Sequence, residues 1–244
     1  MALFTDGPAS AIEDLAAQDS QLLNVASAEG IDLTAKLALA QETVGIELEG
    51  LLRECSGPEL RRVVVTPALR LWHTYRTLET VYQDAYFNQL NDRYSGKRDQ
   101  FRELGMWARE RLRQTGVGLA RHPVPRSSTP DVQQSSGSLP EGTYFVTMSW
   151  VNGAGEEGCA AIPMSVTMPS GGGFLVVPPA APEGVVGWNV YAGNSPDGMT
   201  QLNPYALNPF APWRQTEIPA SGTAPGDGQK PNYLHPLPRM LQRG

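Results

Sequence analysis

The stretch that decides the fold runs from residue 67 to residue 115, and it begins PALRLWHTYRTLETVYQDAYFNQLND (residues 67–92). Large apolar and aromatic residues recur in it at steps of three or four, the spacing of one face of an α-helix. Pro67 suits the first turn of that helix, because a proline there loses no intrahelical hydrogen bond. The pattern predicts a long helix from Pro67 with one partly buried face: Leu71, Tyr75, Leu78, Tyr82, Tyr86 and Leu90.

A polar turn and a second helix are expected next, forming a helical hairpin. The segment 93–96 interrupts the apolar pattern, and Gly96 suits the C-terminal cap of the first helix. A second amphipathic helix is predicted from about Lys97 to Thr115. Four arginines beside its apolar face fall within roughly 60° of one another at about 100° per residue. We call them the arginine edge: Arg98, Arg102, Arg109 and Arg113.

Two further helices are predicted upstream of this hairpin. Residues 8–29 carry apolar residues at helical spacing between Pro8 and Gly30, which suit the start and the end of a helix. Asp32 suits the N-cap of the next helix, whose pattern continues to about residue 55. Segment 59–66 has two interpretations, an extended connector or the entry to the helix at Pro67. Four helices with short connections predict a bundle over residues 1–121.

The composition changes in the second half of the chain. Residues 122–139 are rich in Ser, Gln, Gly and Pro, which predicts a linker or a segment that docks on a partner. Residues 140–222 alternate apolar and polar residues between turn signals, which predicts an antiparallel β-sandwich. Its expected strands are residues 143–151, 159–168, 174–177 and 187–193, with a short one around Trp213 and Ile218. Residues 223–244 are expected to form an extended tail. The predicted fold class is therefore α+β.

Charge is unevenly distributed along a chain whose net charge is −6. Residues 1–59 carry eleven acidic and two basic side chains, whereas residues 60–126 carry thirteen basic and six acidic ones. Two interpretations remain open. Acidic helices could pack beside basic helices within one subunit, or an acidic flank of one subunit could meet a basic flank of the next in a head-to-tail assembly.

The sequence contains no motif that predicts catalysis. Residues 153–158, GAGEEG, match a dinucleotide-binding pattern, but a strand is expected after them where that pattern needs a helix. A hairpin turn is the better interpretation. No nucleophile motif surrounds Cys55 or Cys159. We therefore expect a protein that is not an enzyme and holds no cofactor.

Metal, disulfide and membrane features are also not expected. The three histidines, His73, His122 and His235, lie far apart in the chain, and His73 is expected on an exposed surface. Cys55 and Cys159 fall in different predicted domains, so no disulfide framework is expected. No apolar run approaches the ~20 residues of a membrane span, and the N-terminal residues do not resemble a secretory signal. Synthesis in a reducing cytoplasm is the expectation.

The arginine edge and Tyr94 are the candidate contact residues of the helical half. A run of arginines on a helix is most often a solvated face, but it could also contact a neighbouring subunit or DNA. The net negative charge argues against free-standing DNA binding, though not against lining a channel through which DNA passes. Tyr94, in the predicted turn, is an interface candidate because aromatic residues are enriched at interfaces.

Both halves resemble proteins of tailed bacteriophages. The segment NQLNDRY (residues 88–94), between a Tyr-rich helix and a basic helix, is similar to head-to-tail adaptor proteins, also called connector or head-completion proteins. That resemblance covers about residues 10–126. The segments YFVTMSWVNGAGEE (residues 144–157) and GWNVY (residues 187–191) resemble, in reversed order, strands of the immunoglobulin- or fibronectin-III-like modules of phage virions.

The resemblance implies a structural virion protein at the phage neck. Such proteins form rings, usually of twelve subunits, that dock on the portal, continue the DNA channel and carry the tail or its terminator and nozzle proteins. DNA would pass without sequence-specific binding, and no membrane is involved. The interface or DNA-channel candidates are the arginine edge, Tyr94, Arg121 and Arg126.

An alternative from a different class is also kept. The β-sandwich could be a carbohydrate- or surface-binding module on a helical oligomerisation stalk. Aromatic side chains stack on sugar rings, so three tryptophans are the candidates for such a platform: Trp150, Trp188 and Trp213.

Overall fold

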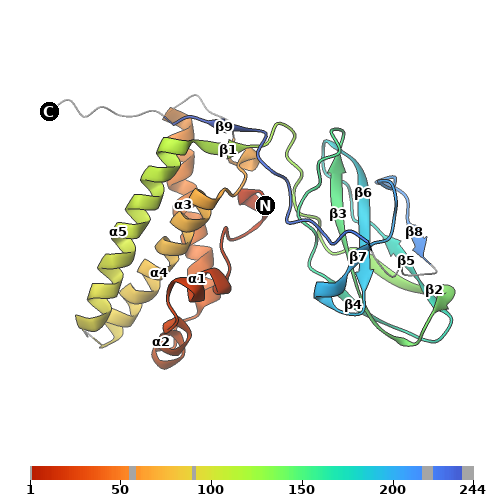
Figure 1. Cartoon of the computed structure of the whole chain (residues 1–244), viewed down its shortest axis with the longest axis horizontal. Helices are drawn as coiled ribbons and strands as arrows, with labels where there is room; N and C mark the ends of the chain where they lie inside the picture. Colours follow the sequence, from red (N-terminus) through yellow and green to blue (C-terminus); the bar gives the residue numbers. More distant parts are fainter. Residues whose placement is uncertain (1, 55–58, 90–91, 216–221, 238–244) are drawn as a thin grey trace. The chain divides into compact units, whose positions relative to one another are not determined.

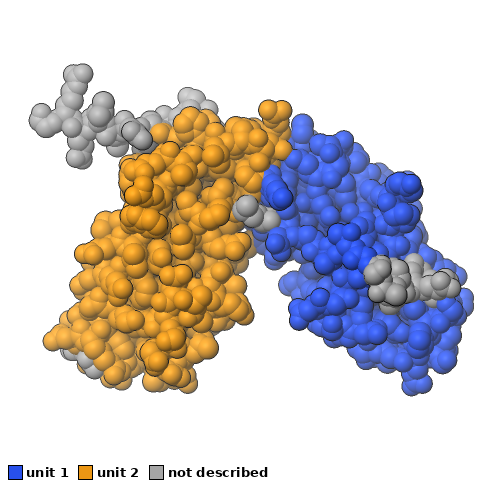
Figure 2. Space-filling view, in the orientation of Figure 1, with its two compact units in different colours: residues 1–6, 122–230 blue, residues 7–121, 231–244 orange. Residues whose placement is uncertain are grey.

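The computed structural model describes residues 2–54, 59–89, 92–215 and 222–237, and its fold is α+β with antiparallel sheets (Figure 1). The chain divides into two compact units (Figure 2). The helical unit is residues 7–121 with residues 231–244, and the strand unit is residues 122–230 with residues 1–6. Each unit therefore includes a segment from the far end of the chain.

The described part of the helical unit has five α-helices rather than the four expected. α4 packs against both α3 and α5, and it also contacts α1 and α2 (Figure 1). A short 3-10 turn, Leu60–Arg62, precedes α4. The helices are α1 (Ile12–Gln18), α2 (Leu22–Glu29), α3 (Leu33–Glu54), α4 (Pro67–Gln89) and α5 (Asp92–Thr115).

The prediction of one helix over residues 8–29 was wrong, because the chain breaks at Asp19. Its backbone is extended there, with φ −146° and ψ 105°. The Asp19 carboxylate accepts hydrogen bonds from the Gln21 backbone N–H, the Tyr82 hydroxyl and the Lys97 ammonium. Bonds to α4 and α5 thus fix this residue outside a helix, an effect that the local apolar pattern does not contain.

The prediction of a turn at residues 93–96 was also wrong. α5 starts at Asp92 and runs through Gly96, so Gly96 is not a cap. Tyr94 is buried and its hydroxyl donates to Glu29 Oε1 of α2 at 2.9 Å. This anchoring outweighs the cost of one interior glycine, about 1 kcal/mol. The expected helix starts at Pro67 and after the Asp32 cap are confirmed, since Asp32 Oδ1 accepts from the Thr34 N–H at 2.8 Å.

Two short strands close the helical unit. β1 (Val117–Leu119) pairs antiparallel with β9 (Tyr233–His235), so the predicted extended tail contains a strand. Val63 bridges to Leu119, which resolves segment 59–66 as a 3-10 turn followed by an extended connector. The Arg62 guanidinium donates to the Ala120 carbonyl and to the Tyr233 hydroxyl. The C-terminal strand is thus bonded to both the β1 strand and the approach to α4.

The described part of the strand unit contains two antiparallel sheets. One has the order β2-β5-β8 and the other the order β4-β3-β6-β7. Residues 131–139, expected to be linker, form β2, and only part of segment 159–168 is a strand. The strands are β2 (Asp131–Leu139), β3 (Gly142–Asn152), β4 (Met164–Met168), β5 (Gly172–Val177), β6 (Val185–Gly193), β7 (Thr200–Gln201) and β8 (Trp213–Gln215). Ile218, expected beside Trp213, lies outside the described residues.

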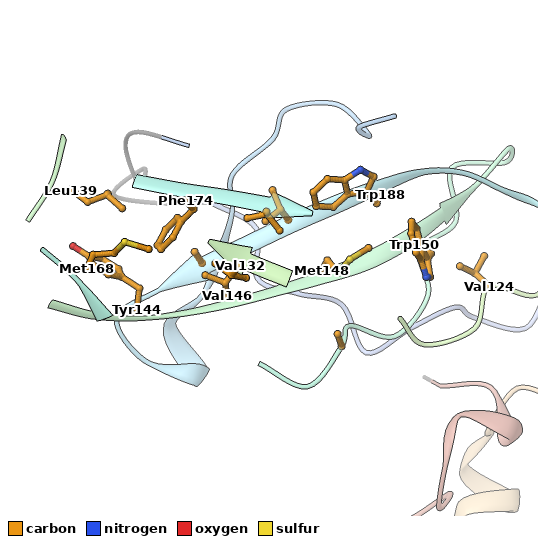
Figure 3. Packing of buried hydrophobic residues seen from close by; sticks show 14 residues of the cluster. Val124, Val132, Leu139, Tyr144, Val146, Met148, Trp150, Met168, Phe174 and Trp188 are labelled. Carbon is orange, nitrogen blue, oxygen red and sulfur yellow. The ribbon is translucent and has the colours of Figure 1, made fainter. Parts of the chain in front are cut away.

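One apolar cluster draws buried residues from both of these sheets. Tyr144 of β3 meets Phe174 of β5 edge-on, with ring centroids 5.5 Å apart. Trp150 of β3 and Trp188 of β6 are direct cross-strand partners. Figure 3 shows the tryptophans toward one end of the cluster and Tyr144, Phe174 and Met168 toward the other.

His73 is fully buried rather than exposed as expected. Its Nε2–H donates to the Leu37 carbonyl of α3 at 3.2 Å, so Nδ1 accepts from the Ser10 hydroxyl at 2.7 Å. Burial lowers the pKa of His73 from 6.5 to about 4, although the Leu37 carbonyl and the charge of Asp14 oppose this shift. The prediction failed because α3 covers the side of α4 next to its apolar face.

The buried imidazole makes the stability of the helical unit depend on pH. The unfolded chain binds a proton at His73 below about pH 6.5, whereas the folded chain excludes it down to about pH 4, so acidification favours unfolding. Lowering the pH from 8 to 5 should remove about 2 kcal/mol through this residue. Urea titrations of His73→Gln should show a shallower pH dependence than the wild type, while His122→Gln, at an exposed position, should keep it. An unchanged dependence in His73→Gln would contradict this assignment.

The β1–β9 pairing predicts a sharp effect of truncation. A chain ending at Lys230 loses β9 and its bonds to Arg62 and β1, each net hydrogen bond being worth about 1 kcal/mol. Its helical unit should unfold with a free energy lower by at least about 2 kcal/mol, measured by helical circular dichroism in urea. A chain ending at Leu237 keeps β9 and is the matched control; equal stability of the two truncations would contradict a structural role for β9.

Candidate functional site

The arginine edge is used largely inside the helical unit. Arg102 Nε donates to Glu79 Oε1 of α4 at 3.0 Å, and the Glu79 side chain is nearly buried. Arg109 Nε lies 3.0 Å from Glu47 Oε2 of α3, and its guanidinium lies 5.9 Å from the ring centroid of Trp72. These contacts follow the intramolecular interpretation of the charge division, with a basic helix beside acidic ones.

The other members of the arginine edge differ from each other. Arg98 pairs with Asp99 of its own helix at 2.9 Å and lies over the Tyr86 ring at 5.2 Å. Arg113 is half-buried, and its Nε has no hydrogen-bond partner among the described residues. All four residues of the arginine edge lie on α5 as predicted, but three of the four already contact a carboxylate.

Arg121 and Arg126 do not join the arginine edge. They belong to different units, and both are exposed. The Arg121 N–H donates to Asn232 Oδ1 at 2.7 Å, and the Arg126 N–H donates to Asp6 Oδ1 at 2.9 Å. The Arg126 guanidinium also lies 3.1 Å from the Cys159 sulfur. Through these backbone N–H groups, the segments around Arg121 and Arg126 are hydrogen-bonded to residues near the two ends of the chain.

Tyr94 is not an exposed contact residue but part of a polar cluster that joins α2 to the α4–α5 hairpin. Asp19 Oδ2 accepts from the Tyr82 hydroxyl at 2.6 Å and from Lys97 Nζ at 2.8 Å. Burial raises the pKa of Asp19, but hydrogen bonds from Lys97 and Tyr82 outweigh this and leave it below its ordinary value. Burial and the bond to Asp19 raise the pKa of Tyr82. The cluster therefore holds the ionised carboxylate of Asp19 beside the neutral phenol of Tyr82.

A hollow of about 400 Å³ opens beside this cluster. Its wall is mainly apolar, and its two cationic side chains already have partners: Lys97 bonds to Asp19, and Arg93 lies 4.4 Å over the Tyr94 ring. We assign the hollow no chemistry of its own. Its lining residues are Gln21, Asn24, Val25, Ala28, Tyr82, Arg93, Tyr94 and Lys97.

The expected hairpin turn at residues 153–158 is confirmed, and it carries a second buried polar cluster. Gly155 has φ +76°, which favours glycine, and Val151 bridges to Glu157 across the turn. The Glu157 carboxylate accepts from the hydroxyls of Ser149 and Tyr191. Burial and this bond raise the pKa of Tyr191. The second glutamate of the motif thus supports the sheet, and its carboxylate would repel a phosphate.

The prediction of an exposed tryptophan platform was wrong. Trp150 and Trp188 are only 2% and 0% exposed, and half-buried Trp213 packs against the same cluster. Trp188 Nε1 donates to the Asn208 carbonyl at 2.9 Å, which satisfies its polar atom inside the core. Strand alternation places both buried rings on the face that carries Met148 and Val190, and this signal was present in the sequence.

The most exposed aromatic side chains of the strand unit were not among the candidates selected from the sequence. Tyr205 and Phe210 are 83% and 84% exposed. They end two Asn-Pro-aromatic triplets, residues 203–205 and 208–210, and this repeat was a signal in the sequence. The Asn203 amide donates to the Tyr205 carbonyl, and Asn208 Oδ1 accepts from the Phe210 N–H. A groove of about 530 Å³ has Phe210 in its wall, and Tyr205 directly precedes another of its lining residues. The lining residues are Val185, Val186, Ala206, Leu207, Asn208, Pro209 and Phe210.

The helical unit also exposes large apolar side chains away from its core. On α3 these are Leu39, 46% exposed, and Ile46, 74% exposed. On α5 they are Met106 and Trp107, and the Arg111 guanidinium lies 5.5 Å from the Trp107 ring centroid. The apolar pattern that predicted the helices did not single out these residues, because they lie outside the face that it traced.

Comparison with known proteins gives no family. No model of a known protein family matches this sequence, and no curated protein matches it. Within the described ranges, no three His, Cys, Asp or Glu side chains are grouped so that they could hold a metal ion. None of the described helices has the length and apolar character needed to cross a membrane. The exposed surfaces of the two units are therefore the features that indicate a function.

Burial of the tryptophans predicts that they act on stability and not on ligand binding. Trp188→Ala should lower the unfolding free energy of the strand unit by about 3–5 kcal/mol, the usual range for a buried tryptophan. Tyr205→Ala, at an exposed position, should leave it within about 0.5 kcal/mol of the wild type. Chemical denaturation monitored by near-ultraviolet circular dichroism makes the comparison, and a fully stable Trp188→Ala protein would contradict the assignment.

Proposed function

We propose that this chain is a structural virion protein that forms a ring at the neck of a tailed bacteriophage, docks on the portal and connects the head to the tail. The observation that carries the proposal is the pair of exposed apolar surfaces on α3 and α5. The core of the helical unit is already filled, so these side chains are left for contacts with other molecules. The resemblance of residues 10–126 to head-to-tail adaptors supplies the biological setting.

A ring is the assembly that two different surfaces favour. Contacts between unlike patches of identical subunits are head-to-tail, and they close into a ring when the rotation between neighbours allows it. Exposed apolar residues on two separate helices of one unit supply such unlike patches. We propose a homo-oligomer of about twelve subunits, the number usual for the phage proteins that this chain resembles.

DNA would cross this ring without specific binding. Glu79, Glu47 and Asp99 already neutralise three members of the arginine edge, so we propose that this edge braces the helical unit. Any DNA contact would then be weak and would decrease with added salt. Synthesis in the host cytoplasm and assembly into the virion complete the proposal, which includes no catalytic step.

We further propose that the strand unit is a β-sandwich of the immunoglobulin or fibronectin-III kind. Its two antiparallel sheets contribute to one apolar cluster, which supports this assignment. Such a module would project from the ring as a brace or as a platform for tail proteins.

The ring is tested by the mass of the assembled protein. Light scattering should be measured on the protein alone and with the portal protein of the virus that encodes it. The proposal predicts a ring of about twelve copies, or a monomer that assembles only on the portal. A monomer or small oligomer that ignores the portal would contradict it.

A second function is favoured by the exposed pair Tyr205 and Phe210. None of the described residues that line the groove beside Phe210 is charged, and the Asn208 and Phe210 side chains suit a neutral sugar. Binding to a panel of neutral glycans should be lost in the double variant Tyr205→Ala, Phe210→Ala and kept in Ile162→Ala, which changes another exposed apolar residue of the strand unit. Glycan binding by the double variant would exclude this surface.

A further inference from the structure

One outward face of α3 combines aliphatic and acidic side chains. Leu39, Glu42, Ile46 and Glu49 follow one another at steps of three or four, and all four are exposed. We call them the α3 stripe. Glu49 has only an exposed 3.4 Å contact with Arg53. Within the described part of the chain, Glu42 has no basic partner. This face therefore offers two aliphatic side chains and a free carboxylate.

A face of α5 has the matching character. Gln100, Leu104, Trp107 and Arg111 recur at steps of four, three and four, and we call them the α5 stripe. Trp107 is 47% exposed and Arg111 is exposed. Arg111 stacks on Trp107 and donates to Gln114 Oε1 at 2.8 Å, but it pairs with no carboxylate among the described residues. This face therefore offers an aromatic ring with an unneutralised cation.

We propose that the α3 stripe of one copy docks on the α5 stripe of the next copy. The proposal rests on the ring described above and names the contact between its subunits. Leu39 and Ile46 would cover the ring of Trp107, and Glu42 would pair with Arg111. The α3 stripe has an acidic residue without a basic partner, and the α5 stripe has a basic residue without an acidic partner. In each stripe the charge lies beside exposed apolar side chains.

The charges also favour head-to-tail pairing over pairing of like faces. Two α3 stripes brought together would place acidic side chains opposite acidic ones, whereas an α3 stripe on an α5 stripe places Glu42 opposite a basic residue. Around α5, at about 100° per residue, Trp107 separates Arg111 from Glu103 and Glu110. The nearest carboxylates of α5 are therefore poorly placed to neutralise Arg111 in a symmetric pair.

Two single substitutions test this contact, one on each face. Ile46→Glu places a charge within the α3 stripe, and Trp107→Glu does so within the α5 stripe; both positions are exposed, so the helical unit should still fold. Each variant alone should lose self-association by about tenfold or more at near-millimolar concentration. Their mixture should form a one-to-one heterodimer and nothing larger, because it retains one intact α3 stripe and one intact α5 stripe. Sedimentation velocity measures all three samples.

The controls separate the contact from the ring. Leu23→Glu changes an exposed leucine of α2 outside both stripes and should assemble as the wild type does. The charge exchange Glu42→Arg with Arg111→Glu in one chain should restore association that either change alone weakens. Wild-type protein that stays monomeric at near-millimolar concentration, variants that associate normally, or a mixture without heterodimer would each overturn the α3–α5 contact. If the Ile46→Glu and Trp107→Glu proteins each still form a ring on the portal, the α3–α5 contact is overturned and the neck assignment stands. If the wild-type protein fails to assemble on the portal, the neck assignment is overturned.

Discussion

The helical unit depends on the burial of α4 between α3 and α5. Polar side chains of α4 are buried along with apolar ones. Thr74 and Thr77 bond to carbonyls of α4 itself, but His73 and Glu79 have partners on flanking helices. α3 supplies the Leu37 carbonyl to His73, and α5 supplies the Arg102 guanidinium to Glu79. These bonds fix which faces of α3 and α5 turn inward. The faces that remain outward carry Ile46 and Trp107, which is why the proposed contacts lie there.

The ends of the chain complete each unit. Residues 231–244 belong to the helical unit, where β9 pairs with β1, and residues 1–6 belong to the strand unit, where Asp6 accepts from the Arg126 N–H. The chain therefore passes between the units three times. A protein built in this way cannot be divided into its two units by a single cut.

The sequence predicted the elements whose signals are local. The start of α4 at Pro67, the cap at Asp32 and the strands β3 and β6 follow from proline chemistry, side-chain capping and period-two alternation. The break at Asp19 and the helical Gly96 could not be predicted, because Tyr82, Lys97 and Glu29 decide them from distant parts of the chain. β2 was assigned to a linker because its composition is polar, yet backbone pairing with β5 needs few apolar side chains. Among the candidate site residues, the arginine edge was placed correctly on one helix. The carboxylates that pair with Arg102 and Arg109 lie on other helices, so the sequence pattern of α5 could not predict them. Trp188 and Tyr205 show that burial of an aromatic residue depends on the strand face and on the turn that presents it.

We propose that this chain is a structural part of the phage neck, and the number of its copies in finished particles would decide this. Purified virions of the virus that encodes it should be analysed by quantitative mass spectrometry against isotope-labelled peptides of this chain and of the portal protein. The account predicts that the chain is present in about the same copy number as the portal protein, as expected for one ring stacked on another. Absence of the chain from purified virions would contradict the account.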